Sequence, residues 1–195
     1  MTKRPTGSEI QADETYRGYA YDGQDLRHSG MEDYVFDDCS FIEADLTSSR
    51  LNGAVFRTCD LSGARMSGCK LFSASVDGCK LLGWDLRDGL NLTATAFTGC
   101  TLDFSLFRGV SLRKMMLERC ALVEADLSLA DLRETTFRDC DLSNVDLNEA
   151  IFHLTDLRGS TLTGWNLRRH DLAGIVIDTW QLRALATEIG ILVLD

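Results

Sequence analysis

Large apolar residues recur at every fifth position of this sequence. The stretch FRDCDLSNVDLNEAIFHLTDL, from Phe137 to Leu157, places Phe or Leu at each fifth residue. An amphipathic helix repeats every 3.6 residues and a half-buried strand every 2, so neither element explains a period of five. The period covers 31 apolar positions from Leu26 to Ile177. A repeat of this length predicts an architecture of stacked copies of one short unit.

The repeat contains one irregularity. The segment LRDGLNL adds a single residue between Leu86 and Leu92, after which the period of five resumes. We expect a small bulge at a corner near Gly89, because one extra residue is readily absorbed in this way. The alternative is a kink that serves the function of the protein.

A second pattern lies two residues before each apolar centre. All seven cysteines occupy this position, and Ala or Ser fills it in many other units. Successive members of one set of six cysteines are 20 or 21 residues apart, which indicates four units per coil and predicts one column of stacked thiols. Because free cysteine behaves as a small buried hydrophobe, we interpret these thiols as core residues, with a metal or redox role as the alternative. The set is Cys39, Cys59, Cys79, Cys100, Cys120 and Cys140.

Composition narrows the classes of function. The 195-residue chain has a formal net charge of -10 and a pI of about 4.7, which argues against direct binding of nucleic acid and fits a basic partner. The N-terminus has no apolar leader and no run of 18 apolar residues occurs, so we expect a cytoplasmic protein without a membrane span. His28, His153 and His170 lie far apart, and no hydrolase or nucleotide-binding motif occurs. We therefore expect no catalytic residue, no metal site and no cofactor.

Charge is unevenly distributed along the chain. Residues 1–45 contain 11 acidic and 4 basic residues, residues 46–120 contain 6 and 10, and residues 121–195 contain 13 and 6. Both ends are therefore acidic, and the middle is mildly basic. An acidic end predicts attraction to basic surfaces, with an affinity that falls as the salt concentration rises.

The five-residue unit resembles that of the pentapeptide-repeat proteins, which reads A(D/N)LXX. The units EADLT, CDLSG, EADLS, LADLR and TDLRG follow it, and the resemblance covers residues 26–177. It implies an all-β fold, a right-handed quadrilateral β-helix with one unit on each face. In that fold the apolar centre and the small residue two positions before it point inward. The repeat would then form a rod of roughly 37 Å, at about 4.8 Å per coil.

The C-terminal sequence DTWQLRALATEIGILVLD breaks the repeat. Asp178, with Gln181 three residues later, is typical of a capping box, and apolar residues follow at helical spacing until Gly190. We predict a short α-helix over residues 179–189 and a strand over residues 191–194. The chain then divides into a flexible tail (1–20), the β-helix (21–177) and a C-terminal cap of helix and strand (178–195).

The cap carries more apolar side chains than one coil end needs. They either plug the last coil or pack against a second copy of the chain, and an exposed patch of this kind usually marks an interface. We predict a homodimer joined through the C-terminus. Its interface would comprise Trp180, Leu182, Leu185, Ala186, Ile189, Ile191 and Val193.

The cap is similar to the C-terminal signature of the Qnr/MfpA branch of the family, with Asp, an aromatic residue, Gln, and then Leu, Gly-Ile and Val. The resemblance implies a rod-like dimer that binds DNA gyrase, a type II topoisomerase, by imitating duplex DNA, and that is associated with fluoroquinolone resistance. Some members carry loops of several residues between coils, whereas this repeat admits one extra residue. Protection of gyrase from a drug or toxin and inhibition of gyrase therefore both stay open. The alternative is a scaffold with an unrelated protein partner.

The acidic C-terminal part supplies the candidate gyrase-binding surface. Asp126 and Asp146 are 20 residues apart and are expected on one face in successive coils, a spacing of the order of that between DNA phosphates. The alternative for each aspartate is a local role, because a short polar side chain before the centre can bond the corner backbone. The predicted surface comprises Glu124, Asp126, Asp131, Asp141, Asp146, Glu149 and Asp156.

Overall fold

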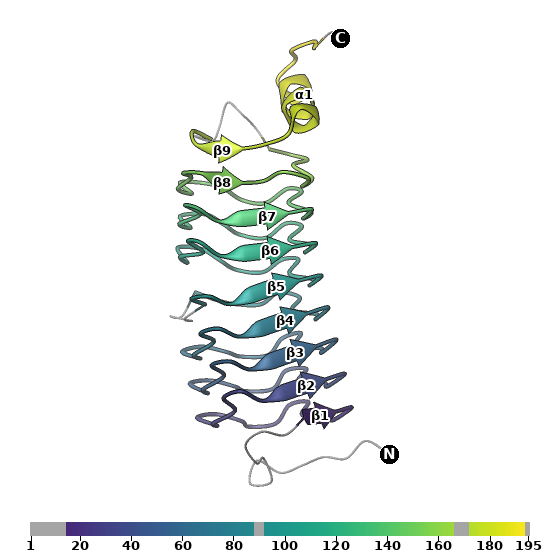
Figure 1. Cartoon of the computed structure of the whole chain (residues 1–195), viewed down its shortest axis with the longest axis vertical. Coiled ribbons are helices and arrows are strands. Elements are labelled where there is room, and N and C mark those ends of the chain that lie inside the picture. Colours follow the sequence, from purple (N-terminus) through teal and green to yellow (C-terminus); the bar gives the residue numbers. More distant parts are fainter. Residues whose placement is uncertain (1–14, 88–91, 166–171, 194–195) are drawn as a thin grey trace.

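The computed structural model of the chain is a rod of stacked coils and describes residues 15–87, 92–165 and 172–193 (Figure 1). Nine short strands among these residues form one sheet, and each strand pairs in parallel with the next. The predicted right-handed quadrilateral β-helix with a short C-terminal helix is confirmed. The strands are Thr15–Arg17 (β1), Val35–Asp37 (β2), Val55–Arg57 (β3), Ser75–Asp77 (β4), Ala96–Thr98 (β5), Met116–Glu118 (β6), Thr136–Arg138 (β7), Thr155–Asp156 (β8) and Ile175–Val176 (β9).

Each coil has four faces, and the strands occupy the same face of every coil. We number the faces in chain order, so that in one coil Phe36 is the centre of face 1, Phe41 of face 2, Leu46 of face 3 and Leu51 of face 4. Faces 2, 3 and 4 stack through isolated bridges between the residues that directly precede the centres. Equivalent side chains of successive coils therefore lie above one another on the outside of the rod.

The added residue changes this register once. Val76 of β4 pairs with Phe97 of β5, and Phe97 pairs in turn with Leu117 of β6. Only the coil between Val76 and Phe97 contains the added residue, and the stack continues in register on both sides of it. The corner at Gly89 lies outside the described residues, and the expected bulge stays a prediction.

Tight turns with one left-handed residue form most corners. The N–H of Ala44 donates to the carbonyl of Phe41 at 3.0 Å, and Glu43 between them has a φ of 56°. This pattern is that of a type II turn, whose third residue favours glycine or asparagine. Most left-handed corner residues are glycine or short polar residues, but Phe104, Leu129 and Leu154 are large and apolar.

The apolar centres form the core, because stacked coils bury their rows against one another. The centres from Leu26 to Leu147 are each at most 3% exposed. The row begins earlier than we expected, because Tyr16 and Tyr21 are buried and continue it. β1 therefore lies inside the segment 1–20 that we expected to be a tail, and the Tyr21 ring stacks on Phe41 with a centroid separation of 4.7 Å.

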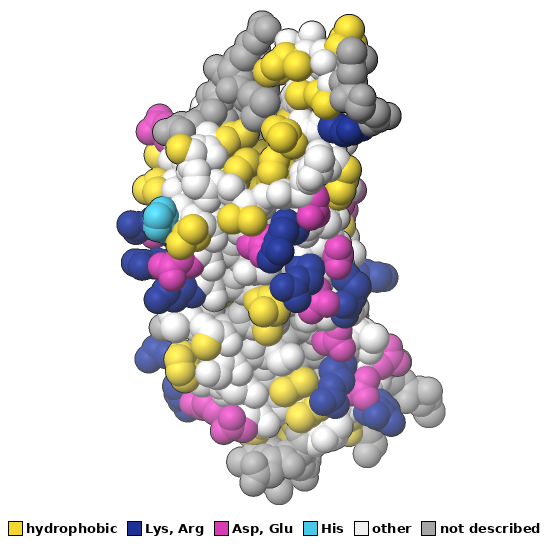
Figure 2. Space-filling model, turned by 45° about the horizontal axis from the view of Figure 1, so that its top comes forward, with side chains coloured by type: hydrophobic (Ala, Val, Ile, Leu, Met, Phe, Trp, Pro, Cys, Tyr) yellow, Lys and Arg dark blue, Asp and Glu magenta, His cyan; other side chains and the backbone are white. Residues whose placement is uncertain are grey.

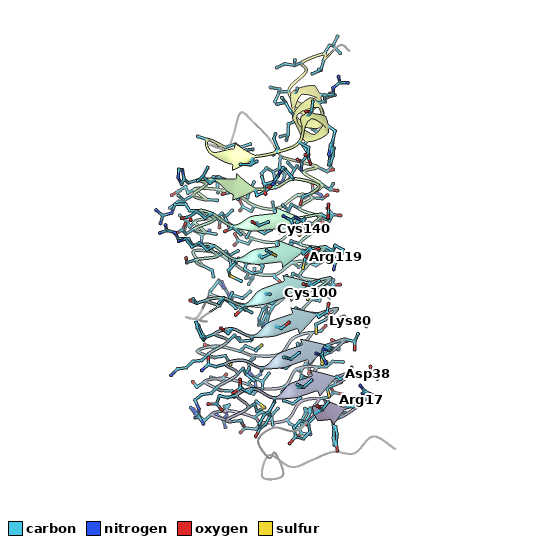
Figure 3. The ribbon with its side chains drawn as sticks, in the orientation of Figure 1. Arg17, Asp38, Lys80, Cys100, Arg119 and Cys140 are labelled. Atoms are coloured by element: carbon cyan, nitrogen blue, oxygen red, sulfur yellow. The ribbon has the colours of Figure 1, made fainter. Side chains whose placement is uncertain are left out.

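The thiols form the predicted column. All seven cysteines are free and buried, and six occupy the corner after face 1 in successive coils, where Figure 3 marks Cys100 and Cys140. The thiol of Cys59 donates to the carbonyl of Phe36 in the preceding coil, with an S–O distance of 3.4 Å. Burial raises the pKa of the Cys69 thiol to about 11, so this side chain stays protonated at neutral pH. Within the described ranges, no group of three or more His, Cys, Asp or Glu side chains could hold a metal ion.

The C-terminal helix α1 spans Thr179–Glu188, which confirms the predicted helix to within one residue. The N–H of Asp178 donates to Oε1 of Gln181 at 2.7 Å in the predicted capping box. Gly190 follows the helix with a φ of 82°, the left-handed conformation that ends many helices. No helix in the described residues is long and apolar enough to cross a membrane.

Helix α1 closes the end of the last coil. Nε2 of Gln181 donates to the carbonyls of Leu157 at 2.7 Å and Ser160 at 2.6 Å. Leu185 and Ala186 on the same helix are buried. Gln181 therefore donates to the carbonyl of Leu157, a face 1 centre, as the thiol of Cys59 donates to the carbonyl of Phe36.

The predicted strand over residues 191–194 is wrong for residues 191–193, which form no strand, while residue 194 lies outside the described residues. The apolar and branched side chains there favour a strand locally, but strand stability depends on pairing and packing with neighbours. Helix α1 carries the chain away from β9 (Figure 1), so the segment does not reach the sheet edge.

Candidate acidic surface and apolar cap

The seven predicted carboxylates are distributed over all four faces of the rod rather than gathered on one. The stacking of successive coils fixes the face of each one, because bridged residues lie above each other. Asp126 and Asp146 lie on face 3, Asp141 on face 2, Asp131 on face 4, Asp156 on face 1, and Glu124 and Glu149 at the corners before and after face 3.

Four of these side chains surround the corner between faces 2 and 3. Glu124 is the left-handed residue at that corner, and Asp126 follows it on face 3 of the same coil. Asp141 and Asp146 flank the same corner in the next coil, and Asp146 is the direct neighbour of Asp126 across the coils. We call Glu124, Asp126, Asp141 and Asp146 the corner cluster.

Two of the other predicted acids are neutralised within their own units. Nη2 of Arg133 lies 2.7 Å from Oδ2 of Asp131, and Arg158 makes the same contact with Asp156 at 2.7 Å. These side-chain hydrogen bonds lower the pKa of both aspartates. Figure 2 shows face 1, where Lys and Arg side chains lie among Asp and Glu side chains along the edges. A surface of mixed charge of this kind is a poor imitation of a phosphate backbone.

The corner cluster differs, because no described Lys, Arg or His forms an ion pair with it. Oδ1 of Asp126 accepts the backbone N–H of Ser128 at 2.9 Å, and Oδ1 of Asp146 accepts that of Asn148 at 2.9 Å. These bonds are the local role that we considered as the alternative for each aspartate. They place the carboxylates without cancelling their charge. Arg108 contacts this group only indirectly, through a 2.8 Å bond to the hydroxyl of Ser128.

The same outward position on face 3 carries aspartate in most described coils. In the N-terminal half, Asp25 is paired with Arg27 at 2.6 Å, Asp45 with Arg65 at 3.0 Å and Asp85 with Arg87 at 2.7 Å. Asp126 and Asp146 continue this column without such partners among the described residues. We did not predict the column from the sequence, although counting along the chain one coil at a time reveals it. Like charges in direct cross-strand contact are destabilising, so the contact between Asp126 and Asp146 lowers the stability of the fold.

The predicted apolar residues of the cap separate into two groups. Leu185 and Ala186 are buried against their own chain, and Ile189 is half-buried. The exposed members are Trp180, Leu182, Ile191 and Val193, and Leu192, which the prediction omitted, is 87% exposed. Figure 2 shows hydrophobic side chains gathered toward this end of the rod. The cap therefore closes the last coil with its buried residues and also exposes an apolar surface.

Comparison with solved structures found agreement in fold with QnrB1, described as a plasmid-mediated fluoroquinolone resistance protein. A trypsin-treated variant of QnrB1 aligns with a TM-score of 0.62 at 24% identity, covering 92% of this chain and 99% of that chain. Full-length QnrB1 aligns with a TM-score of 0.55 at 22% identity, covering 91% and 100%. At this identity the agreement establishes a shared fold. A search of curated proteins found no match.

The family comparison agrees with the repeat seen in the coils. The model of pentapeptide repeats matches eight copies, in residues 39–87 and 125–164. These ranges include part of the thiol column, most of the corner cluster and many of the aspartates that precede the apolar centres. Such repeats generally build non-catalytic proteins. The period of five, the four-sided coil and this match together make the chain a pentapeptide-repeat protein.

Proposed function

We propose that the protein binds DNA gyrase, a type II topoisomerase, in the cytoplasm as a rod-shaped mimic of duplex DNA. Through this contact it would alter the response of the enzyme to fluoroquinolones or to a gyrase toxin. The observation that carries the proposal is the corner cluster, a set of carboxylates on a rod without ion pairs among the described residues. The shared fold with a fluoroquinolone resistance protein supports the choice of target.

The spacing of the cluster suits a surface that binds DNA. Successive coils lie about 4.8 Å apart, so Asp126 and Asp146 present two charges at a separation of the order of that between phosphates. Lys and Arg side chains arranged for a phosphate backbone can pair with such charges. The interaction is electrostatic and is therefore weakened by salt.

The exposed part of the cap supports a homodimer through the C-terminus. In this proposal Trp180, Leu182, Ile191 and Val193 contact a twofold-related copy, with Leu192 added. Leu185 and Ala186 stay inside their own chain and hold the helix in place. A dimer of this kind brings two acidic C-terminal halves together, which lengthens the negative surface.

The proposal is tested by DNA supercoiling with purified gyrase, titrated with the protein with and without ciprofloxacin. We expect an effect at micromolar protein that weakens from about 50 mM to about 200 mM salt. Inhibition without drug and rescue with drug distinguish the two modes of action. No effect on either reaction at any salt concentration would overturn the proposal and favour a scaffold with an unrelated partner.

A further inference from the structure

An exposed apolar patch lies directly beside the corner cluster on the same corner of the rod. It consists of Leu82, Phe104 and Leu106, which we call the apolar patch. The side chains of Leu82 and Phe104 are 46% and 51% exposed, and Leu106 is half-buried. Large apolar side chains that stay in water without a packing role are candidates for a protein contact.

Stacking of the coils places the patch against the cluster. Leu106 is the direct cross-coil neighbour of Asp126 on face 3. At the corner, the N–H of Phe104 donates to the carbonyl of Val123 at 3.0 Å, and Val123 directly precedes Glu124. Phe104 and Glu124 therefore occupy equivalent corner positions in successive coils. The apolar and acidic groups form one continuous surface.

The backbone at Phe104 is unfavourable for an aromatic residue. Its φ is 59°, a left-handed conformation that a bulky side chain rarely adopts. The equivalent corner residue of the preceding coil is Gly83, whose φ of 66° is the same left-handed conformation. A glycine would therefore fit the Phe104 corner at least as well, and burial of the ring does not compensate because half of it is exposed.

A hollow continues the surface on the other side of the patch. Its volume is about 230 Å³, and its lining includes the corner glycines Gly63 and Gly83 and the charged residues Arg65 and Asp85. The charge of Arg65 is paired with Asp45 at 3.0 Å. The corner between faces 2 and 3 thus presents a recess, an apolar projection and four carboxylates in sequence along the rod. A surface of this shape is suited to binding a folded protein, whose surface can place apolar and charged side chains side by side.

We propose that this corner is a composite docking surface for a basic protein surface that carries an apolar side chain among its Lys and Arg residues. The lysines and arginines would face the corner cluster, and the apolar side chain would pack against Phe104 and Leu82. Charge complementarity selects this partner, because the four adjacent carboxylates repel nucleic acid. The inference rests on the proposed function, in which gyrase supplies the basic surface. It adds a contact that salt does not screen and that a pure DNA mimic would lack.

The test uses Phe104→Gly, which removes the ring and suits the left-handed backbone. The matched control is Leu154→Gly, because Leu154 is also a left-handed corner residue, with a φ of 52° and 60% exposure, at the corner between faces 4 and 1. A second variant, Leu82→Ser, removes the neighbouring apolar side chain. Affinity for purified gyrase is measured by biolayer interferometry at about 50 and 200 mM salt, together with melting temperature and sedimentation.

We expect Phe104→Gly to weaken binding about tenfold at both salt concentrations, which is the size of effect expected when an interface anchor is removed. Leu82→Ser should weaken binding in the same way, while Leu154→Gly binds like the wild type. The melting temperature of Phe104→Gly should be equal to or higher than that of the wild type. Wild-type affinity in both patch variants would overturn the docking surface and leave the proposed function standing.

Two further outcomes would also decide against the inference. If the wild-type protein does not bind gyrase at all, both the docking surface and the proposed function are overturned. If Phe104→Gly changes the oligomeric state in sedimentation while Leu154→Gly does not, the patch is a contact between copies of this chain. The same set of variants therefore separates the possible occupants of the corner.

Discussion

Replacing Asp126, Asp141 and Asp146 together with asparagine tests the charge of the corner cluster apart from its geometry. Asparagine keeps an acceptor oxygen for the corner N–H, such as the 3.0 Å bond that Ser143 donates to Asp141, and removes the negative charge. An exposed ion pair contributes about 0.2–1 kcal/mol, so removing three ion pairs with a basic partner costs about 1–3 kcal/mol. We expect gyrase binding to weaken by roughly 5- to 150-fold at low salt, and less at high salt.

The same triple variant should be slightly more stable than the wild type. Asp126 and Asp146 are direct neighbours of like charge, and their repulsion costs about 0.2–1 kcal/mol. Its removal should raise the melting temperature by about 1–3 °C in calorimetry. Weaker binding combined with higher stability is a result that general misfolding does not produce.

The matched control replaces Asp25, Asp45 and Asp85 with asparagine. These residues occupy the same column of face 3, but each is already paired with an arginine. We expect gyrase affinity to change by less than about threefold and stability not to increase. If both triple variants weakened binding equally, the position of the unpaired charge would be irrelevant and the reasoning would be refuted.

Three further predictions concern the cap and the ion pairs. Gln181→Ala removes a donor from the carbonyls of Leu157 and Ser160, and only Leu157 keeps another described donor, the N–H of Ser160 at 3.1 Å. The free energy of unfolding should therefore fall by about 1–3 kcal/mol in denaturant titration, and an unchanged midpoint would contradict the role of this side chain. Replacing Trp180 and Leu182 with serine should yield a monomer in sedimentation with unchanged circular dichroism, whereas a persistent dimer would place the interface elsewhere. Because Arg158 lowers the pKa of Asp156, the ion pair stabilises the fold above the ordinary aspartate pKa and is lost as the pH falls through the lowered value. The stability advantage of the wild type over Asp156→Asn should be constant above about pH 5 and shrink below about pH 4.

The sequence was sufficient to predict the coil because the controlling interactions repeat every five residues. One row of apolar centres, one slot for small residues and one irregularity determine where every described coil lies. Tyr21 lies inside the predicted β-helix (21–177), but the strand Thr15–Arg17 was missed because Tyr16 borders an N-terminal segment that reads as a polar tail. Both rings are buried because Phe36 and Phe41 stack over them, and each of these contacts joins one coil to the next.

The distribution of charge was harder to predict than the coil. The acids were counted along the chain, whereas their effect depends on the face that each one occupies and on the cations within reach. The arginine of an ion pair comes from the same unit at Asp131 and from the next coil at Asp45. The failed strand near Ile191 has a related cause, since a strand depends on a partner that the local sequence does not specify.

At the corner aspartates the fold needs a side-chain acceptor oxygen but does not need a negative charge. The turn at Asp126 needs an oxygen that accepts the N–H of Ser128, and an asparagine amide supplies one equally well. The negative charge contributes nothing to that bond, and at Asp146 it adds repulsion across the coil. In the N-terminal half an arginine offsets the same repulsion, which shows that the column can be neutralised within this architecture. Among the described residues the charge of the corner cluster has no ion-pair partner and no role in the turn, and a basic partner that binds there would give it one.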